Sequence, residues 1–198
     1  MKSIILLIAA YLIGSIPTAY LVVKLIKGVD IRTVGSGNVG ATNAGRVLGF
    51  YGFLLVFIID MLKGFLPVYL TKLFFGDTLF LYIVALCTIL GHTFTIFLNF
   101  KGGKGVATGV GVYLALSPLN LLYAFIAFIL MVGIFRMVSL GSIVGAIVLS
   151  ATMWLGEQSI ILKIFTTLLA IFVIYKHKEN IKRIINGTEK KIGEKVNI

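Results

Sequence analysis

A polar segment rich in glycine, Gly35–Asn43, interrupts a chain that is otherwise strongly hydrophobic. Its glycines let the backbone turn so that successive N–H groups point to one side. Its polar side chains add further hydrogen-bonding groups: Ser36, Asn38, Thr42 and Asn43. Arg32 and Arg46 flank this segment, called here the glycine island, with fixed positive charge. The combination predicts a loop that binds phosphate oxygens.

A second polar segment, Lys101–Thr108, places Gly102 and Gly103 directly before Lys104. Where a helix begins, unpaired N–H groups and the helix dipole attract an anion, and a lysine adds charge. We therefore predict a second phosphate-binding segment. The alternative is that the glycines that follow, up to Gly111, only allow neighbouring helices to pack closely.

Two known nucleotide-binding patterns are excluded by their context. Residues 35–40 satisfy the G-x-G-x-x-G dinucleotide pattern, but a hydrophobic helix precedes them instead of the required strand. Lys104 is followed by Gly105 instead of serine or threonine, so the second segment is not a Walker A loop.

Two further polar segments, 136–142 and 176–183, lie at the ends of hydrophobic stretches. The first contains Ser142. The second contains His177 and Asn180, which share a face if the helix continues, because they are three residues apart. Several basic neighbours surround His177, so we expect its imidazole to stay neutral and to donate a hydrogen bond to substrate.

Three ionisable residues are predicted inside the membrane. Asp60 and Lys63, three residues apart in the predicted span 48–70, are expected to neutralise one another, because a lone charge is costly there. His92 lies near the end of the predicted span 79–98. For His92, a role in helix capping or in support of a nearby site fits the sequence at least as well as a catalytic role.

The composition places the chain in the membrane. Hydrophobic residues make up 59% and charged residues 13%, with a mean hydropathy of +1.07, whereas a soluble domain has roughly 25% charged residues. The predicted fold is all-α, one domain over residues 1–198, with spans at about 4–26, 48–70, 79–98, 104–117, 119–135, 138–155 and 158–175. The first span lacks a small-residue cleavage site, so we expect it to be retained.

The distribution of charge predicts the topology. Fourteen of the 18 Lys and Arg residues lie on one side of the proposed spans: Lys24, Lys27, Arg32, Arg46, Lys101, Lys104, Arg136, Lys176, Lys178, Lys182, Arg183, Lys190, Lys191 and Lys195. By the positive-inside rule this side is cytoplasmic, with the N-terminus outside and the C-terminus inside. Opposite termini require an odd number of spans, which supports seven transmembrane helices. The alternative is six spans with residues 104–117 re-entrant.

The remaining inventory limits the chemistry. The net charge of +11 is explained by topology, so no nucleic-acid partner is expected. The seven acidic residues are scattered, and the single cysteine, Cys87, has no partner in the chain, so we predict no metal, no cofactor and no disulfide. Neither histidine has an aspartate five residues later, which argues against the H-x-x-x-x-D acyltransferases that use acyl thioesters.

Three stretches carry a resemblance to a known family. They are Gly35–Asn43, Phe100–Thr108, and His177-x-x-Asn180-Ile181-x-Arg183 followed by Gly187-x-Glu189. Together they resemble the three motifs of the PlsY family, which are bacterial acyl-phosphate:glycerol-3-phosphate acyltransferases. The resemblance covers essentially the whole chain, and no motif position departs from it.

The resemblance implies transfer of a fatty acyl group from acyl phosphate to the 1-hydroxyl of glycerol 3-phosphate. The products are lysophosphatidic acid and phosphate, in the first step of phospholipid synthesis. It also implies a multi-pass protein of the bacterial cytoplasmic (inner) membrane with its active site on the cytoplasmic side. Membrane lipid surrounds such a protein, and no obligatory protein partner is implied.

The predicted site residues follow from the motifs and the chemistry. The catalytic set is Ser36, Lys104, His177 and Asn180, and the substrate-binding set is Gly37, Asn38, Gly40, Thr42, Asn43, Arg46, Gly102, Gly103, Thr108 and Ser142. We expect the segment from Gly102 to Lys104, with Ser36 and Asn38, to hold the acyl phosphate. The residues expected to hold glycerol 3-phosphate are Lys104, Arg46, Ser142, His177 and Asn180. A substrate phosphate oxygen is the expected proton acceptor, because no carboxylate base is well placed.

Two other functions fit part of the sequence. An organic-phosphate transporter also needs a basic anion site in a helical bundle, but the glycine segments lie at one membrane face and no inverted repeat is visible. A lipid-binding scaffold would use the basic C-terminal segment but leaves the glycine segments without a role.

Overall fold

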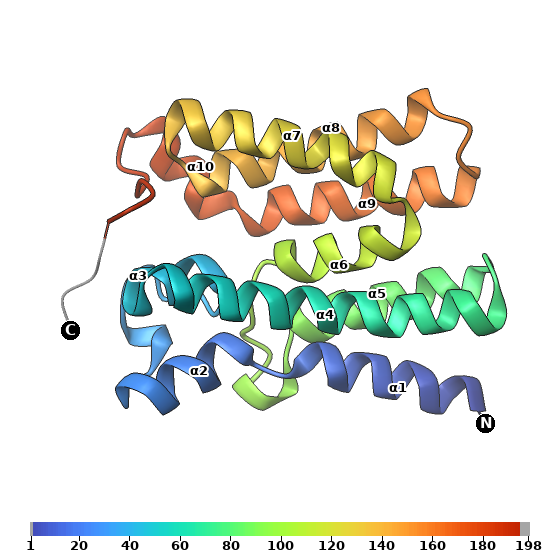
Figure 1. Ribbon diagram of the computed structural model, residues 1–198, viewed down its shortest axis with the longest axis horizontal. Coiled ribbons are helices and arrows are strands. Elements are labelled where there is room, and N and C mark those ends of the chain that lie inside the picture. Colours follow the sequence, from blue (N-terminus) through green and yellow to red (C-terminus); the bar gives the residue numbers. More distant parts are fainter. Residues whose placement is uncertain (1, 195–198) are drawn as a thin grey trace. The chain divides into compact units, whose positions relative to one another are not determined.

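The computed structural model describes residues 2–194, which Figure 1 shows as helices joined by loops. Within these residues no strand occurs, which confirms the all-α prediction. Met1 and Lys195, the latter one of the cations used to assign topology, lie outside the described residues. The described chain divides into two compact units, one up to residue 116 and the other from residue 117 to residue 194. The single domain over residues 1–198 stays a prediction.

The first unit is built on long apolar helices and short helical turns. Its elements are α1 (Lys2–Ser15), α2 (Thr18–Lys27), η1 (Ile31–Thr33), α3 (Ala41–Leu48), α4 (Phe50–Phe75), α5 (Leu79–Thr93), η2 (Ile96–Leu98) and α6 (Val106–Leu116). Helix α4 packs against α3, α5 and α6, and α1 packs against α5. The chain breaks between α1 and α2 at Pro17, because proline supplies no N–H to continue a helix.

Glycines let these helices approach closely. A Cβ on Gly14 of α1 would collide with the carbonyl of Thr88 on α5, and one on Gly111 of α6 would collide with the carbonyl of Met61 on α4. The packing role considered for the glycines of α6 is therefore confirmed for Gly111. At Gly109 a Cβ would meet no described residue within 4 Å.

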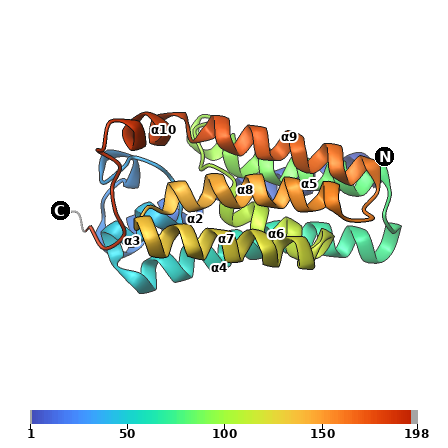
Figure 2. The same ribbon diagram turned by 90° about the horizontal axis from the view of Figure 1, so that it is seen from above.

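The second unit is a helical bundle with a folded C-terminal segment. It contains α7 (Pro118–Phe135), α8 (Val138–Leu155), α9 (Ile160–Lys176) and α10 (Lys178–Ile185). Helix α8 packs against both α7 and α9, as Figure 2 shows. Helix α10 is bent by 58° from α9 at His177.

Five apolar helical stretches in the described chain are long enough to cross a membrane: Ser3–Lys27, Phe50–Phe75, Leu79–Leu98, Pro118–Phe135 and Val138–Leu155. A sixth is present if α9 and α10 count as one bent span. These six correspond to the predicted stretches. The seventh, predicted at 104–117, is the 11-residue α6, shorter than the roughly 20 residues a span needs. The number seven and the orientation of the termini stay predictions.

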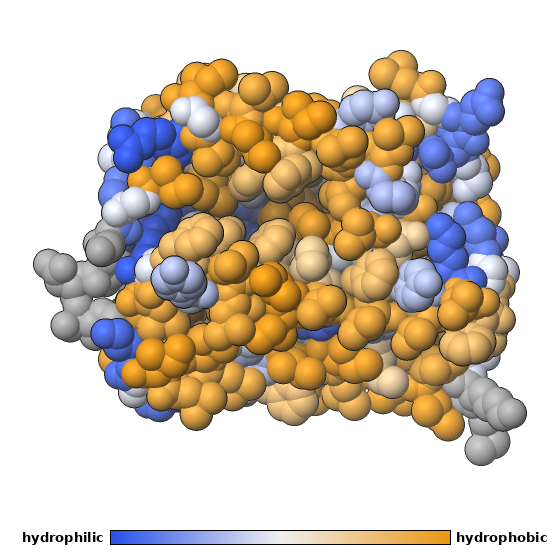
Figure 3. Space-filling view, viewed as in Figure 1, coloured by the Kyte–Doolittle hydropathy of each residue, from blue (hydrophilic) through white to orange (hydrophobic). Residues whose placement is uncertain are grey.

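The surface of these helices suits a lipid environment. Large hydrophobic side chains such as Leu25, Tyr51 and Leu155 are 83%, 83% and 87% exposed. Figure 3 shows hydrophobic residues over most of the visible face and strongly hydrophilic residues mainly toward its left and right edges. So much exposed apolar surface is unfavourable in water but matches the bilayer interior. The protein is a multi-pass membrane protein.

Candidate active site

Residues 35–40 of the glycine island form a loop between η1 and α3, and its last three residues, 41–43, begin α3. Gly35 (φ 65°) and Gly37 (φ 70°) have left-handed backbone conformations that other residues rarely adopt. A Cβ on Gly35 would also collide with the side-chain oxygen of Asn43. Glycine at position 35 is therefore required both by backbone conformation and by space.

Asn43, in the first turn of α3, holds the island from inside. Its Oδ1 accepts the N–H of Ser36 at 2.9 Å, and its Nδ2 donates to the carbonyls of Ile31 at 3.2 Å and Val34 at 3.0 Å. The residue is 1% exposed. Both amide hydrogens are used within the loop, so Asn43 fixes the shape of the island in this structure.

The other predicted residues of the island lie nearer its surface. Ser36 is exposed, and four residues are partly exposed: Gly37, Asn38, Gly40 and Thr42. Gly40 is the N-cap of α3, and Thr42 lies in the first turn of that helix. The island thus presents a hydroxyl and amide groups beside a helix N-terminus, an arrangement that suits a phosphate group.

The two arginines that flank the island have different surroundings. The Nη2 atom of Arg32 lies 2.6 Å from Oδ2 of Asp30, and its Nε lies 3.0 Å from Oδ1. The hydrogen bond from Arg32 lowers the pKa of Asp30 below its usual value. The positive charge of Arg32 is thus largely balanced by Asp30. Arg46 lies in the last turn of α3 and is half-buried.

A strained turn leads into the segment that contains Lys104. Asn99 (φ 52°) and Phe100 (φ 60°) both have left-handed backbones although neither is glycine. The N–H of Phe100 donates to the carbonyl of Thr95 at 2.9 Å, which holds the turn. Strained backbone of this kind is concentrated at functional sites.

The next two residues, Gly102 and Gly103, are anchored to the end of α5. Their N–H groups donate to the carbonyls of Thr93 and His92, each at 3.1 Å. The expectation that these two glycines offer unpaired N–H groups to an anion is therefore wrong. A Cβ on either glycine would collide with His92, so close packing explains the absence of a side chain.

Lys104 lies between this anchored turn and the N-terminus of α6. Gly105 (φ 82°) turns the chain into the helix, and the N–H of Gly109 donates to its carbonyl at 2.7 Å to close the first turn. Thr108 follows in that turn, fully buried, with a hydroxyl that has no hydrogen-bond partner among the described residues. The first N–H groups of a helix have no partner within it, so the first turn of α6 has amides that can receive an anion.

In the second unit the central residue is Glu189, which is 7% exposed. Its Oε1 accepts hydrogen bonds from Ser139 Oγ at 2.7 Å and Asn180 Nδ2 at 2.6 Å. Its Oε2 accepts one from Arg183 Nε at 2.7 Å. Gly187 (φ 69°), just after α10, turns the chain so that Glu189 reaches these three partners.

The surroundings of Glu189 keep it ionised. Burial by itself raises the pKa of this carboxyl, but the hydrogen bonds from Ser139, Asn180 and Arg183 outweigh burial and lower the pKa below its usual value. The interpretation of the acidic residues as scattered missed this role. The signal that pointed to it was the resemblance of Gly187-x-Glu189 to part of the third motif.

His177 and Ser142 are the other predicted site residues of this unit. His177 is 3% exposed, and its Nδ1 lies 2.8 Å from the carbonyl of Val173. Because a carbonyl only accepts, Nδ1 carries the proton, and a neutral His177 has its lone pair on Nε2. Donation to substrate through Nε2 therefore requires the imidazolium, and the predicted role of His177 toward substrate stays a prediction. Ser142, 8% exposed, donates to the carbonyl of Val138 at 2.9 Å.

The structure brings the predicted residues together in two groups. The island, Arg46 and Lys104 belong to the first unit, and Ser142, His177 and Asn180 belong to the second. The role of each of these side chains toward a substrate stays a prediction.

These features define the class of the protein: a multi-pass helical membrane protein whose polar loops carry groups suited to binding phosphate. The family model described as glycerol-3-phosphate acyltransferase matches residues 4–187. The chain is 47% identical to the glycerol-3-phosphate acyltransferase of Desulforamulus reducens over 193 residues, which are 98% of this chain and 96% of the relative. It is 49% identical to that of Trichlorobacter lovleyi over 183 residues, with 92% and 93% covered. The chain therefore belongs to the glycerol-3-phosphate acyltransferase family.

Solved structures agree with this assignment. The chain is similar to the crystal structure of PlsY (YgiH), an integral membrane glycerol 3-phosphate acyltransferase, in its glycerol 3-phosphate form, with 41% identity and a TM-score of 0.93 over 98% of this chain and 96% of that one. For the lysophosphatidic acid form of PlsY the identity is 40% and the TM-score 0.88, with 98% and 97% covered. The resemblance noted in the sequence is confirmed.

Proposed function

We propose that the protein transfers a fatty acyl group from acyl phosphate to the 1-hydroxyl of glycerol 3-phosphate, which gives lysophosphatidic acid and phosphate. Membership of the acyltransferase family supports the reaction class. The observation that carries the chemistry is the position of Lys104, which a left-handed Gly105 places directly before the N-terminus of α6. A fixed cation and a helix dipole then act on the same anion.

The donor explains why the site needs few reactive groups. Acyl phosphate already carries a good leaving group, so the substrate hydroxyl attacks the acyl carbon directly. The bond from that carbon to the phosphate oxygen breaks, and phosphate leaves with the bonding electrons. The protein has to hold two reactants in line, and positioning supplies up to about 7–11 kcal/mol of the barrier reduction in well-oriented reactions.

Two phosphate groups repel one another unless cations offset their charge. We assign the donor phosphate to Lys104, the first turn of α6, and Ser36 and Asn38 of the island. We assign glycerol 3-phosphate to a set in which Lys104 is shared: Lys104, Arg46, Ser142, His177 and Asn180. The groups on α6 also stabilise the oxyanion that develops on the acyl oxygen.

The proton of the hydroxyl goes to a phosphate oxygen of a substrate. Phosphate monoesters have a second pKa of about 6, so such an oxygen is a competent acceptor. Glu189 is a poor candidate for the base, because three donors occupy its carboxylate and its pKa is lowered. The role of Glu189 is to orient Asn180.

We place the protein in the bacterial cytoplasmic membrane, with α6 as the seventh span, the N-terminus outside and the site on the cytoplasmic side. The excess of Lys and Arg on one side of the spans supports this orientation. The acyl chain of the donor then lies between hydrophobic helices that are open to lipid.

The test uses the purified full chain in detergent, with acyl phosphate and labelled glycerol 3-phosphate. We expect labelled lysophosphatidic acid and one phosphate released per molecule formed. Lys104→Ala serves as the control with strongly reduced activity. Detergent removes the two compartments that transport requires, so product in detergent also excludes an organic-phosphate transporter as the sole function. No product in detergent, together with uptake of glycerol 3-phosphate into vesicles, would overturn the proposal.

A further inference from the structure

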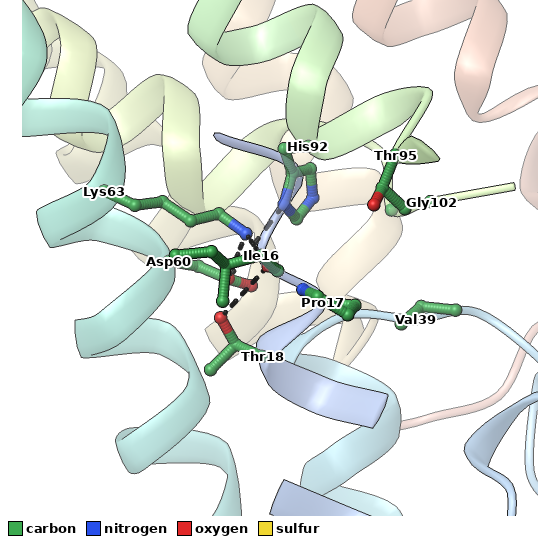
Figure 4. A pocket seen from close by; sticks show the side chains of 10 residues that line it. Ile16, Pro17, Thr18, Val39, Asp60, Lys63, His92, Thr95 and Gly102 are labelled. Carbon is green, nitrogen blue, oxygen red and sulfur yellow. Dashed lines mark hydrogen bonds and ion pairs between the residues drawn. The ribbon is translucent and has the colours of Figure 1, made fainter. Parts of the chain in front are cut away.

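Three ionisable side chains, Asp60, Lys63 and His92, form a buried cluster in the first unit, and Figure 4 shows them pointing toward one another. Asp60 and Lys63 lie one turn apart on α4, with 2.7 Å between Nζ and Oδ1 and side-chain exposures of 2% and 5%. A buried ion pair inside a membrane span is costly to assemble and persists only where both charges are held. The expected pairing of Asp60 with Lys63 is confirmed.

The pair also contacts two other parts of the first unit. Lys63 donates to the carbonyl of Ile16 at 2.8 Å, at the break between α1 and α2. Oδ1 of Asp60 lies 4.0 Å from Nδ1 of His92, at the end of α5. The ion pair therefore connects the broken first helix with the imidazole of His92.

A cavity beside the cluster shows which elements meet there. Its lining includes the cluster, Val39 of the island, and both Gly102 and Gly103. Its volume is about 10 Å³, enough for about one water, whereas ligand pockets have roughly 300–1,000 Å³. The cluster is thus part of the wall behind the two glycine segments and does not itself receive a substrate.

His92 contacts the second glycine segment through both its backbone and its ring. Its carbonyl accepts the N–H of Gly103 at 3.1 Å. A Cβ on Gly103 would collide with Nε2 of His92 and would lie 3.1 Å from the carbonyl of Val39. The imidazole therefore lies against the residue that directly precedes Lys104, where the two glycine segments meet.

We propose that His92 is a positioning residue for the donor-phosphate site. Asp60, paired with Lys63, lies beside the imidazole at 4.0 Å, and the ring sets the position of Gly103 against Val39 and thereby the direction in which Lys104 leaves the turn. This inference rests on the proposed function, because it gives Lys104 the role assigned above. His92 acts through Gly103 and exchanges no proton with substrate.

A double-mutant cycle tests the contact. We expect Gly103→Ala to lower kcat/KM by about 10²-fold, because displacement of a catalytic group by about 1 Å has effects of that size. We expect His92→Ala to lower it by about tenfold. In the His92→Ala background the ring is gone, so Gly103→Ala should cost less than about threefold. Losses that multiply in the double variant would overturn the proposal.

A second readout separates positioning from folding. We expect His92→Ala to raise the KM for acyl phosphate more than that for glycerol 3-phosphate, and His92→Gln, which keeps a polar group of similar reach, to recover part of the loss. Thr88→Val is the matched control, because Thr88 is buried one turn earlier on α5 and its hydroxyl donates to the carbonyl of Val84 within the same helix. If His92→Ala lowers only the yield of folded protein and leaves both KM values unchanged, the role is structural and the proposal fails.

The same variants distinguish this inference from the proposed function. A wild-type protein that makes no lysophosphatidic acid would overturn the proposed function.

The contact between His92 and Gly103 can be measured without turnover, by thermal unfolding in detergent of wild type, the two single variants and the double variant. We expect Gly103→Ala to lower the midpoint in the wild-type background and to have little effect after His92→Ala. If His92→Ala does not accumulate, His92→Ser, which also removes the ring, replaces it in the cycle, and equal shifts in both backgrounds would contradict the contact.

Discussion

The side-chain amide of Asn180 donates a 2.6 Å hydrogen bond to Oε1 of Glu189, so a predicted catalytic residue is oriented by a carboxylate from the segment after α10. The same oxygen accepts from Ser139, and Arg183 binds the other oxygen. One buried carboxylate thus connects α8, α10 and the chain that follows.

Glu189→Gln should lower turnover by at least about tenfold, because hydrogen bonds to a charged group contribute roughly 1.5–3 kcal/mol each and the glutamine amide would face a donor of Asn180 or Arg183. The measurement is kcat and KM of purified protein. Glu179→Gln is the matched control, because the Glu179 side chain is 59% exposed and lies 3.5 Å from Lys182. Equal activity of the two variants would contradict the orienting role.

The pH dependence of stability should also depend on Glu189. Its pKa in the folded protein is below the ordinary value of 4.5, so the stabilisation is fully present above that value and is lost as the pH falls through the lower, folded pKa. Thermal unfolding of wild type and Glu189→Gln should therefore differ most at neutral pH, and the difference should shrink in acid. A difference that stays constant to about pH 3 would contradict the lowered pKa.

Asn43→Asp should unfold the island although the two residues have nearly the same shape. Aspartate has no N–H to donate to the buried carbonyl of Ile31 and the partly buried carbonyl of Val34, and an unpaired buried acceptor costs about 1–3 kcal/mol. We expect a lower unfolding midpoint and near-complete loss of turnover. Thr33→Val, which removes a hydroxyl that bonds Asp30 on the exposed side of η1, should behave almost as wild type. Normal activity of Asn43→Asp would exclude the role assigned to the amide.

Lys104→Ala should reduce kcat/KM by about 10²–10³-fold, the usual effect of removing a group that stabilises transition-state charge. Lys101→Ala, which alters an exposed lysine of the same segment, should change it less than about threefold. The comparison is made with both substrates varied in turn. Near-normal activity of Lys104→Ala would contradict the assignment of Lys104 to phosphate binding.

His177→Ala should retain a few per cent of turnover, because a substrate phosphate oxygen accepts the proton and His177 contributes only binding. Lys178→Ala, which alters the exposed next residue, is the matched control. Activity at the level of the uncatalysed reaction for His177→Ala would instead identify His177 as an obligatory base. A neutral His177 with its proton on Nδ1 has a lone pair on Nε2 that could accept the proton of the substrate hydroxyl.

Much of the fold could be predicted because membrane insertion acts on contiguous segments. A run of about 20 apolar residues is a property of neighbouring positions, so the spans that begin near residues 4, 48, 79, 119, 138 and 158 were located well. The short α6 was harder to assign from the sequence, because its 11 residues are too few for a membrane span. Close packing against α4 at Gly111 helps to hold this helix.

The candidate site was predicted less completely, because hydrogen-bond partners are chosen by the folded chain. Gly102 and Gly103 looked like anion-binding amides, yet the carbonyls at the end of α5 accept their hydrogens. Asn43 looked like a substrate ligand, yet both of its amide hydrogens bind the loop that precedes it. Residue type shows that a group can donate, but only the fold shows to which acceptor.

By itself, the sequence determined that this is a helical membrane protein, where its long spans lie, and which three motifs tie it to the glycerol-3-phosphate acyltransferases, since hydropathy and motif spacing are local properties. Only the tertiary structure decided that Ser139, 50 residues from Glu189, shares its carboxylate with Asn180. It also decided that His92 lies against Gly103. Such contacts join residues far apart in the chain, and they exist only after the helices have packed.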